Sequence, residues 1–130
     1  MTQTRLGRVA LTVEDVDAAA ADFSDLFGLD FRCFDIPAMQ MRVAVGEHGI
    51  ELVQSLADDA PSGYPAGLLS GVCIAVEDVE RTRSRLERKG RKMIMSIPLE
   101  SGRSEYVFEP VHGIPLMIYQ DCGHFDPIAQ

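Results

Sequence analysis

A nine-residue segment near the start of the chain recurs further along, and this repeat constrains the fold more than any other feature. Residues 9–17 read VALTVEDVD and residues 72–80 read VCIAVEDVE, a spacing of 63 residues with five identical positions. In each copy an apolar run meets Glu-Asp and then passes into a pattern typical of a helix. Two copies indicate a duplicated module, because a solenoid needs at least three repeats.

The first copy opens a series of elements delimited by alternation and by turn residues. Residues 5–13 alternate in the manner of a strand, and Asp15 is a suitable N-cap for a helix that runs to Phe27. Gly28 stands where glycine commonly ends a helix. Strands follow at residues 29–36, 39–45 and 50–54. The predicted helix carries one apolar stripe, at Val16, Ala19, Ala20, Phe23 and Phe27.

The second copy predicts the same order of elements. A strand at 71–76 leads to a helix that Asp78 caps and that runs to about Lys89, and strands follow at 92–99, 104–109 and 115–119. Residues 55–70, rich in Pro, Gly and Asp, form a linker, and residues 121–130 form a loosely ordered tail. We therefore predict a single α+β domain, 1–130. Two βαβββ modules, 5–54 and 71–120, form curved mixed sheets around a cup-shaped pocket.

Charge and cysteine usage exclude several classes of partner. The net charge of −8 and the pI of about 4.7 disfavour nucleic acid and anionic membranes as partners. Seven of the twelve basic residues lie within 81–92, and we interpret them as a solvated helix face. Three cysteines without CxxC spacing, and no apolar leader or span, predict a cytoplasmic protein.

The order of these elements resembles the vicinal oxygen chelate superfamily. That group includes glyoxalase I, methylmalonyl-CoA epimerase, extradiol dioxygenases, and the fosfomycin and bleomycin resistance proteins. The resemblance covers residues 5–120 and rests on residues 9–16, on LFGL at 26–29, on GIELV at 49–53 and on EPVHG at 109–113. It implies the glyoxalase/bleomycin resistance fold and a homodimer.

The resemblance also locates the positions where metal-using members carry a His on the first strand of a module and a Glu on its last. These positions hold Arg8 and Glu51 in the first module, and Gly71 and Met117 in the second. Arginine is permanently charged and cannot donate to a cation. One ligand of four therefore remains, whereas a divalent transition ion wants at least three protein donors. We predict no metal and no other cofactor, with a divalent metal as the alternative.

Strand parity predicts which side chains face the pocket. Arg8 and Glu51 form either a structural ion pair in place of the metal, or a pair that orients a ligand, with Arg8 binding an anionic oxygen. Glu51 is also the candidate catalytic base. Cys73 fits a small buried apolar position or a nucleophile. The predicted ligand-binding residues are Arg8, Thr12, Glu51, Cys73, Met117 and Tyr119.

Three functions remain open at this point. The first is a metal-free binding protein that sequesters a small, largely apolar or cationic molecule, as antibiotic resistance proteins of this type do. The second is a lyase, isomerase or dioxygenase that uses Glu51 with a displaced or absent metal. The third is a fold used only for association, without a ligand.

Overall fold

The computed structural model describes residues 4–57, 69–123 and 126–129. The chain divides into two compact units: an N-terminal unit of residues 8–70, and a C-terminal unit of residues 71–130 together with residues 1–7. Most of the predicted linker, 55–70, lies outside the described residues. Among the described residues, no helix is both long enough and apolar enough to cross a membrane.

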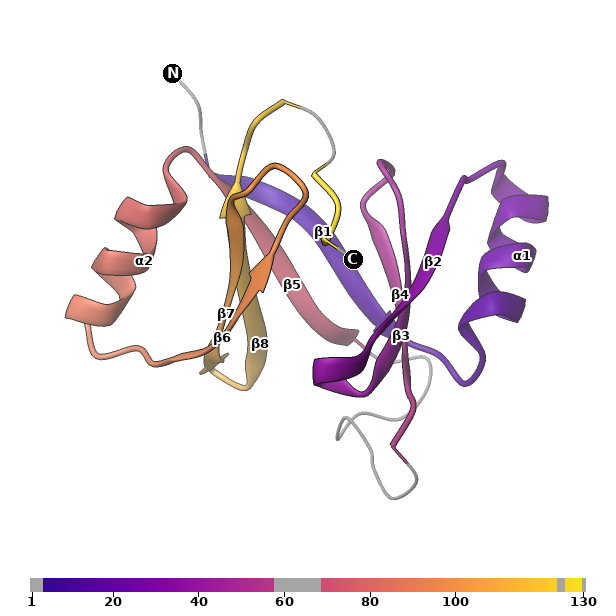
Figure 1. The fold of residues 1–130 in the computed structure, drawn as a ribbon, viewed down its shortest axis with the longest axis horizontal. Coiled ribbons are helices and arrows are strands. Elements are labelled where there is room, and N and C mark those ends of the chain that lie inside the picture. Colours follow the sequence, from indigo (N-terminus) through magenta and orange to yellow (C-terminus); the bar gives the residue numbers. More distant parts are fainter. Residues whose placement is uncertain (1–3, 58–68, 124–125, 130) are drawn as a thin grey trace. The chain divides into compact units, whose positions relative to one another are not determined.

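The N-terminal unit has the predicted strand-helix-strand-strand-strand order (Figure 1). Its strands lie in the order β2-β3-β4-β1. Neighbours pair antiparallel except β1 and β4, which are parallel, so the sheet is mixed. The 3₁₀ turn η1 connects β2 and β3. The elements are β1 (Arg5–Thr12), α1 (Val16–Phe27), β2 (Arg32–Ile36), η1 (Pro37–Met39), β3 (Met41–Val45) and β4 (Ile50–Ser55).

Both ends of α1 follow from the local sequence. The Asp15 carboxylate accepts a hydrogen bond of 3.1 Å from the backbone N–H of Ala18, and Gly28 ends the helix with a left-handed φ of 69°. The predicted apolar stripe is not buried along its whole length. Val16 and Ala20 are buried, whereas Phe27 at the end of the helix is 65% exposed. The core beneath α1 contains Val16, Ala20, Ala44 and Leu52.

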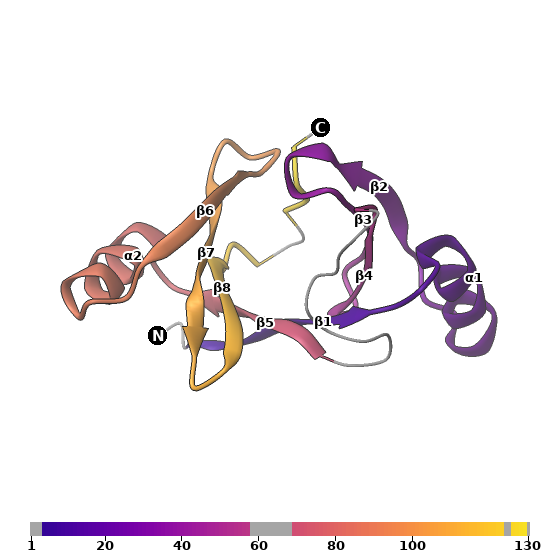
Figure 2. The same cartoon turned by 90° about the horizontal axis from the view of Figure 1, so that it is seen from below.

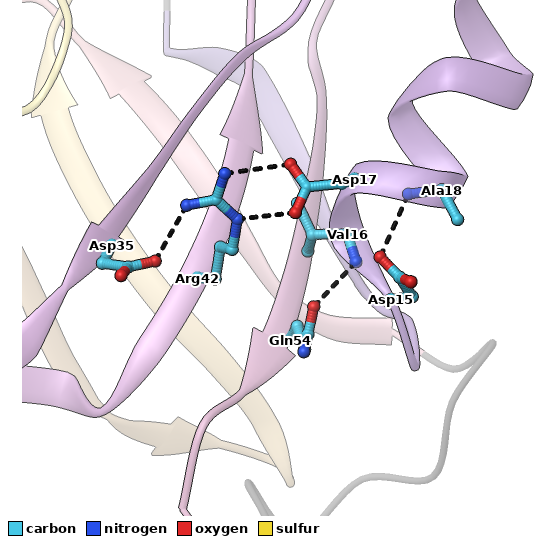
Figure 3. Close-up of polar contacts among 7 residues, drawn as sticks. All are labelled: Asp15, Val16, Asp17, Ala18, Asp35, Arg42 and Gln54. Carbon is cyan, nitrogen blue, oxygen red and sulfur yellow. Dashed lines mark hydrogen bonds and ion pairs between the residues drawn. The ribbon is translucent and has the colours of Figure 1, made fainter.

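Two polar anchors that the sequence analysis missed hold α1 on its sheet (Figure 3). The Gln54 side chain on β4 accepts a hydrogen bond of 2.8 Å from the N–H of Val16 at the helix start. Arg42 on β3 donates twice to Asp17, each at 2.9 Å, and once to Asp35 at 2.9 Å. The hydrogen bond from Arg42 lowers the pKa of Asp17 below its usual value.

The C-terminal unit repeats this architecture. Its strands lie in the order β5-β8-β7-β6, with β5 and β8 parallel and the other pairs antiparallel. Figure 2 shows α2 beside this sheet, and α2 contacts β8. The core on the α2 side contains Val76, Val79, Tyr106, Phe108 and Ile118. The elements are β5 (Leu69–Val76), α2 (Val79–Arg88), β6 (Met93–Pro98), β7 (Ser104–Val111) and β8 (Ile114–Gln120).

The helix start of the C-terminal unit uses the same devices. Asp78 accepts a hydrogen bond of 3.0 Å from the N–H of Arg81. Gln120, on the last strand, accepts one of 3.0 Å from the N–H of Val79. The duplication therefore extends beyond the nine-residue repeat to an acceptor glutamine at the end of each module.

The chain after β8 differs from the loosely ordered tail that the sequence predicts. Asp126 is 9% exposed, and its carboxylate accepts hydrogen bonds from the backbone N–H of Ser101, at 3.2 Å, and from the Ser101 hydroxyl, at 2.6 Å. Ile128 forms an antiparallel bridge with Leu99. Residues 126–129 are thus held against the connection between β6 and β7, because the carboxylate satisfies polar groups in that turn.

Candidate functional site

In the N-terminal unit, the register of β1 against β4 decides which side chains share a face. Ala10 pairs with Glu51, and Thr12 pairs with Val53. Because side chains two residues apart on a strand point the same way, Arg8 and Thr12 lie on the face that carries Glu51. The alternate residues of these strands include Leu11 and Leu52, which pack in the core beneath α1. The charged residues therefore lie on the sheet face opposite α1.

This face is buried and largely apolar around its charges. Arg8 is 9% exposed, Glu51 is 6% exposed and Thr12 is 7% exposed. Ala10 and Val53 beside them are also buried. Arg8 is a diagonal neighbour of Glu51, at a Cα separation of roughly 7–8 Å, a distance that long side chains can span. The attraction between two opposite charges that approach each other offsets part of the free energy needed to remove both from water. An isolated buried charge has no such compensation.

The third predicted residue of this face, Thr12, has a partner that the sequence did not indicate. Its hydroxyl forms a hydrogen bond with the hydroxyl of Ser70 at the start of β5. Thr12 is therefore oriented by a hydroxyl from residue 70, at the far end of the predicted linker. The hydroxyl pair adds a neutral polar group to the face that carries Arg8 and Glu51.

In the C-terminal unit, the other three predicted residues also share one face. Cys73 pairs with Met117, and Ala75 pairs with Tyr119, across the parallel strands β5 and β8. This is the face opposite α2, since the alternate residue Ile118 lies in the core beneath that helix. Cys73 is fully buried, and its Sγ lies 3.9 Å from Sδ of Met117.

Tyr119 reaches across to the first strand of the chain. A side-chain carbon added at Gly7 would collide with the Tyr119 hydroxyl and ring. Glycine at position 7 is therefore required for the tyrosine ring to lie where it does. This close approach places the Tyr119 hydroxyl beside β1.

Glu105 is a buried acid that the sequence analysis missed. It is 1% exposed, lies on β7 opposite Ile97, and is two residues from Val107, which pairs with Met117. Glu105 therefore shares the face of Cys73, Met117 and Tyr119. The predicted strand at residues 104–109 puts residues 105 and 107 on one face, and this was the signal available in the sequence.

The six predicted residues thus fall into two sets, one in each unit. Arg8, Thr12 and Glu51 share the face opposite α1. Cys73, Met117 and Tyr119 share the face opposite α2. A single pocket lined by both sets stays a prediction from the sequence.

The donors of the N-terminal set do not fit a divalent metal. Within the described residues, no group of three or more His, Cys, Asp and Glu side chains is placed to hold an ion. Arg8 occupies the same buried face as Glu51. The Arg8 guanidinium would repel a divalent ion bound to Glu51; at a separation of about 8 Å and an effective dielectric of about 20, this repulsion amounts to about 4 kcal/mol. One carboxylate cannot offset this repulsion and also complete a coordination shell.

Comparison with known proteins identifies the family. Residues 8–108 match the family model of the Glyoxalase/Bleomycin resistance protein/Dioxygenase superfamily. The chain belongs to this superfamily. A relative within the superfamily is the ethylmalonyl-CoA/methylmalonyl-CoA epimerase of Cereibacter sphaeroides. It is 30% identical over 101 residues, which cover 71% of this chain and 75% of the relative.

Solved structures agree with the glyoxalase/bleomycin resistance fold that the resemblance implies. A variant of the Streptomyces coelicolor methylmalonyl-CoA epimerase, in complex with 2-nitronate-propionyl-CoA, has a TM-score of 0.75 at 14% identity, covering 97% of this chain and 100% of that one. The hypothetical protein BH1468 from Bacillus halodurans has a TM-score of 0.72 at 18% identity, covering 92% and 96%. At these identities the likeness establishes the fold alone.

Proposed function

We propose that this chain is a metal-independent member of its superfamily that binds a small, largely apolar molecule through the face opposite α1. The observation that carries the proposal is the buried Arg8 on the same face as Glu51. Arg8 supplies a fixed cation that pairs with an anionic oxygen of the ligand. Glu51 accepts a hydrogen bond from a donor on the ligand, and the buried alanine and valine side chains contact its apolar body.

The ligands named for related structures are consistent with this chemistry. One epimerase structure holds methylmalonyl-CoA, whose acyl group joins a carboxylate to a short apolar carbon skeleton. A cation set in an apolar wall suits such a group, because the carboxylate gains a charge-assisted hydrogen bond while the carbon chain leaves water. We therefore expect an anionic ligand to be preferred over a cationic one of the same size.

A matched set of probes tests the proposal. Phenylacetate, phenylacetamide and phenethylamine share one apolar body and differ in charge, and their binding can be compared by calorimetry on protein treated with chelator. We expect phenylacetate to bind best, and Arg8→Met to remove that preference. Glu14→Gln, at an exposed position, is the control. Binding that requires an added divalent metal, or a preference for the amine that Arg8→Met leaves unchanged, would contradict the proposal.

An isomerase is the second candidate, and the 30% identity to an epimerase favours it. In this case Glu51 takes the proton from the carbon between the thioester carbonyl and the carboxylate, and the electron pair moves into the carbonyl as an enolate. A proton from solvent then adds to the opposite face of that carbon, which inverts the centre, and Glu51 releases the proton it took to solvent. Arg8 holds the carboxylate during the exchange.

Solvent deuterium distinguishes an isomerase from a binding protein. Methylmalonyl-CoA is incubated with the protein in D₂O, and mass spectrometry measures deuterium in the acyl group against a protein-free control. An isomerase introduces one deuterium per turnover, and Glu51→Gln abolishes the uptake while Glu14→Gln does not. If the parent protein gives no uptake above the control, this candidate is refuted and the binding proposal stands on its own test.

We also propose that the protein is a homodimer, because two-fold pairs are the commonest assemblies among soluble proteins. Several large apolar side chains are exposed, among them Leu26 at 69% and Ile94 at 60%. Light scattering at micromolar concentration measures the assembly directly. A mass near that of one chain, 14.3 kDa, would contradict the proposal.

A further inference from the structure

The C-terminal end of α1 exposes large apolar side chains next to acidic ones. Leu26 is 69% exposed and Phe27 is 65% exposed, and Asp22 and Asp25 are exposed as well. Residues three and four apart are neighbours on a helix surface, so Asp22 lies beside both Asp25 and Leu26. These four residues form one surface, which we call the acidic patch.

The acidic patch is unfavourable for α1 by itself. The C-terminal end of a helix carries a partial negative charge, which basic side chains in the last turn can offset. The last turn of α1 has no basic residue, and Asp25 adds a further negative charge within it. The exposed apolar surface of Leu26 and Phe27 also stays in contact with water. A positively charged partner with an apolar surface relieves both unfavourable interactions.

The equivalent end of α2 has the opposite charge. The spacing of 63 residues that relates the starts of the two helices also relates Asp22 to Arg85 and Asp25 to Arg88. Both arginines are exposed, as is Lys89 at the C-cap of α2. The second module therefore presents basic side chains at the positions where the first module presents carboxylates.

An apolar side chain is exposed close to these basic residues. Met93 begins β6, four residues after the C-cap Lys89. It pairs with Phe108, which belongs to the core on the α2 side of the sheet, so Met93 lies on the face toward α2. Met93 is 39% exposed. Together with Arg85, Arg88 and Lys89 it forms a surface that we call the basic patch.

We propose that the acidic patch of one copy of this chain docks against the basic patch of a second copy. The carboxylates of the acidic patch pair with the guanidinium groups of the basic patch. The exposed apolar side chains of the two patches leave water together. A second copy is the partner because this chain itself carries the surface of complementary charge and apolar character. The inference rests on the proposed homodimer, and it adds the surface through which the copies associate.

Charge reversal tests this surface by light scattering at micromolar concentration. The parent protein should have about twice the mass of one chain, 14.3 kDa. Asp22→Arg/Asp25→Arg should weaken the association by at least about tenfold, because like charges then face each other. Arg85→Asp/Arg88→Asp should have the same effect. An equimolar mixture of the two variants should associate as the parent does, because one variant carries two basic patches and the other carries two acidic ones.

Glu14→Arg/Glu77→Arg is the matched control, since it makes the same change in net charge at exposed positions outside both patches. It should leave the association unchanged. Circular dichroism checks that each variant is folded. Should a reversed variant fail to fold, Asp22→Asn/Asp25→Asn decides, and it should weaken the association in the same direction but less.

The outcomes separate this surface from the homodimer itself. A parent protein with the mass of one chain would contradict the homodimer and the surface together. A dimeric parent whose association neither reversed variant weakens would overturn the surface alone. Failure of the two reversed variants to associate when mixed would overturn it as well. Ligand binding has its own test, because neither Arg8 nor Glu51 belongs to either patch.

Discussion

The buried charges of the face opposite α1 give the sharpest stability prediction. Glu51→Ala should destabilise the protein by about 3–5 kcal/mol, because it leaves the Arg8 guanidinium buried without a matching charge. Arg8 is 9% exposed and Glu51 is 6% exposed, so water cannot compensate for the lost partner in place. At an effective dielectric of about 20, opposite unit charges attract by about 4 kcal/mol at about 4 Å and by about 2 kcal/mol at about 8 Å, so the cost increases with the closeness of the two groups.

A double-mutant cycle separates this pair from its surroundings. Arg8→Met should cost about as much as Glu51→Leu, since each variant leaves one buried charge. The combined variant should cost far less than the sum, because two apolar side chains of similar volume can replace a buried ion pair at little loss. We therefore expect a coupling energy of at least about 2 kcal/mol.

Urea unfolding measures all four corners of the cycle. Midpoints can be compared directly where the slope against urea is unchanged between variants. Glu14→Gln is the control and should shift stability by less than about 0.5 kcal/mol, because Glu14 is exposed. If the two single costs add to the cost of the double variant within about 0.5 kcal/mol, the residues act separately and the paired reading of this face is refuted.

Three further predictions concern side-chain contacts that stabilise the two units. Gln54→Ala and Gln120→Ala should each cost about 1 kcal/mol in urea unfolding, because each removes the acceptor at a helix start; a cost near zero for both would contradict the anchoring role. Asp17 has a pKa lowered by its hydrogen bond with Arg42, so the stability it contributes is present above its unfolded pKa and is lost as the pH falls through its folded pKa. In a pH series of urea midpoints, Asp17→Asn should therefore reduce the loss of stability at acid pH. An unchanged loss would contradict this prediction. Gly7→Ala places a methyl group where the Tyr119 hydroxyl lies. It should therefore lower the melting temperature, unless the Tyr119 ring is also truncated.

Much of the fold could be read from local signals. The repeat at residues 9–17 and 72–80 predicted two modules, and Asp15 and Gly28 predicted the ends of α1. These signals succeed because a cap or an alternation acts within a few residues of itself. A local signal fails where a residue's contacts come from a part of the chain that is distant in sequence. Asp126 is an example: its order depends on a turn 25 residues earlier in the chain.

The candidate site, like the fold, could be predicted from the sequence only in part. Parity within each strand, together with the ligand positions that the resemblance implies, predicted that Arg8, Thr12 and Glu51 face the pocket, and that Cys73, Met117 and Tyr119 do so as well. Parity does not show which residues on neighbouring strands are opposite one another. The pairing of Ala10 with Glu51, and of Cys73 with Met117, is a matter of register between strands about 40 residues apart in sequence.

The sequence by itself determined the duplicated architecture and the approximate helix boundaries, since each depends on residue types at positions close together in the chain. Only the tertiary structure decided that Glu105 is buried, that Gln54 and Gln120 anchor the two helices, and that the Cys73 and Met117 sulfurs meet. These are contacts between elements distant in sequence. They form because strand pairing brings such residues together, and burial then makes a polar group without a partner too costly to keep.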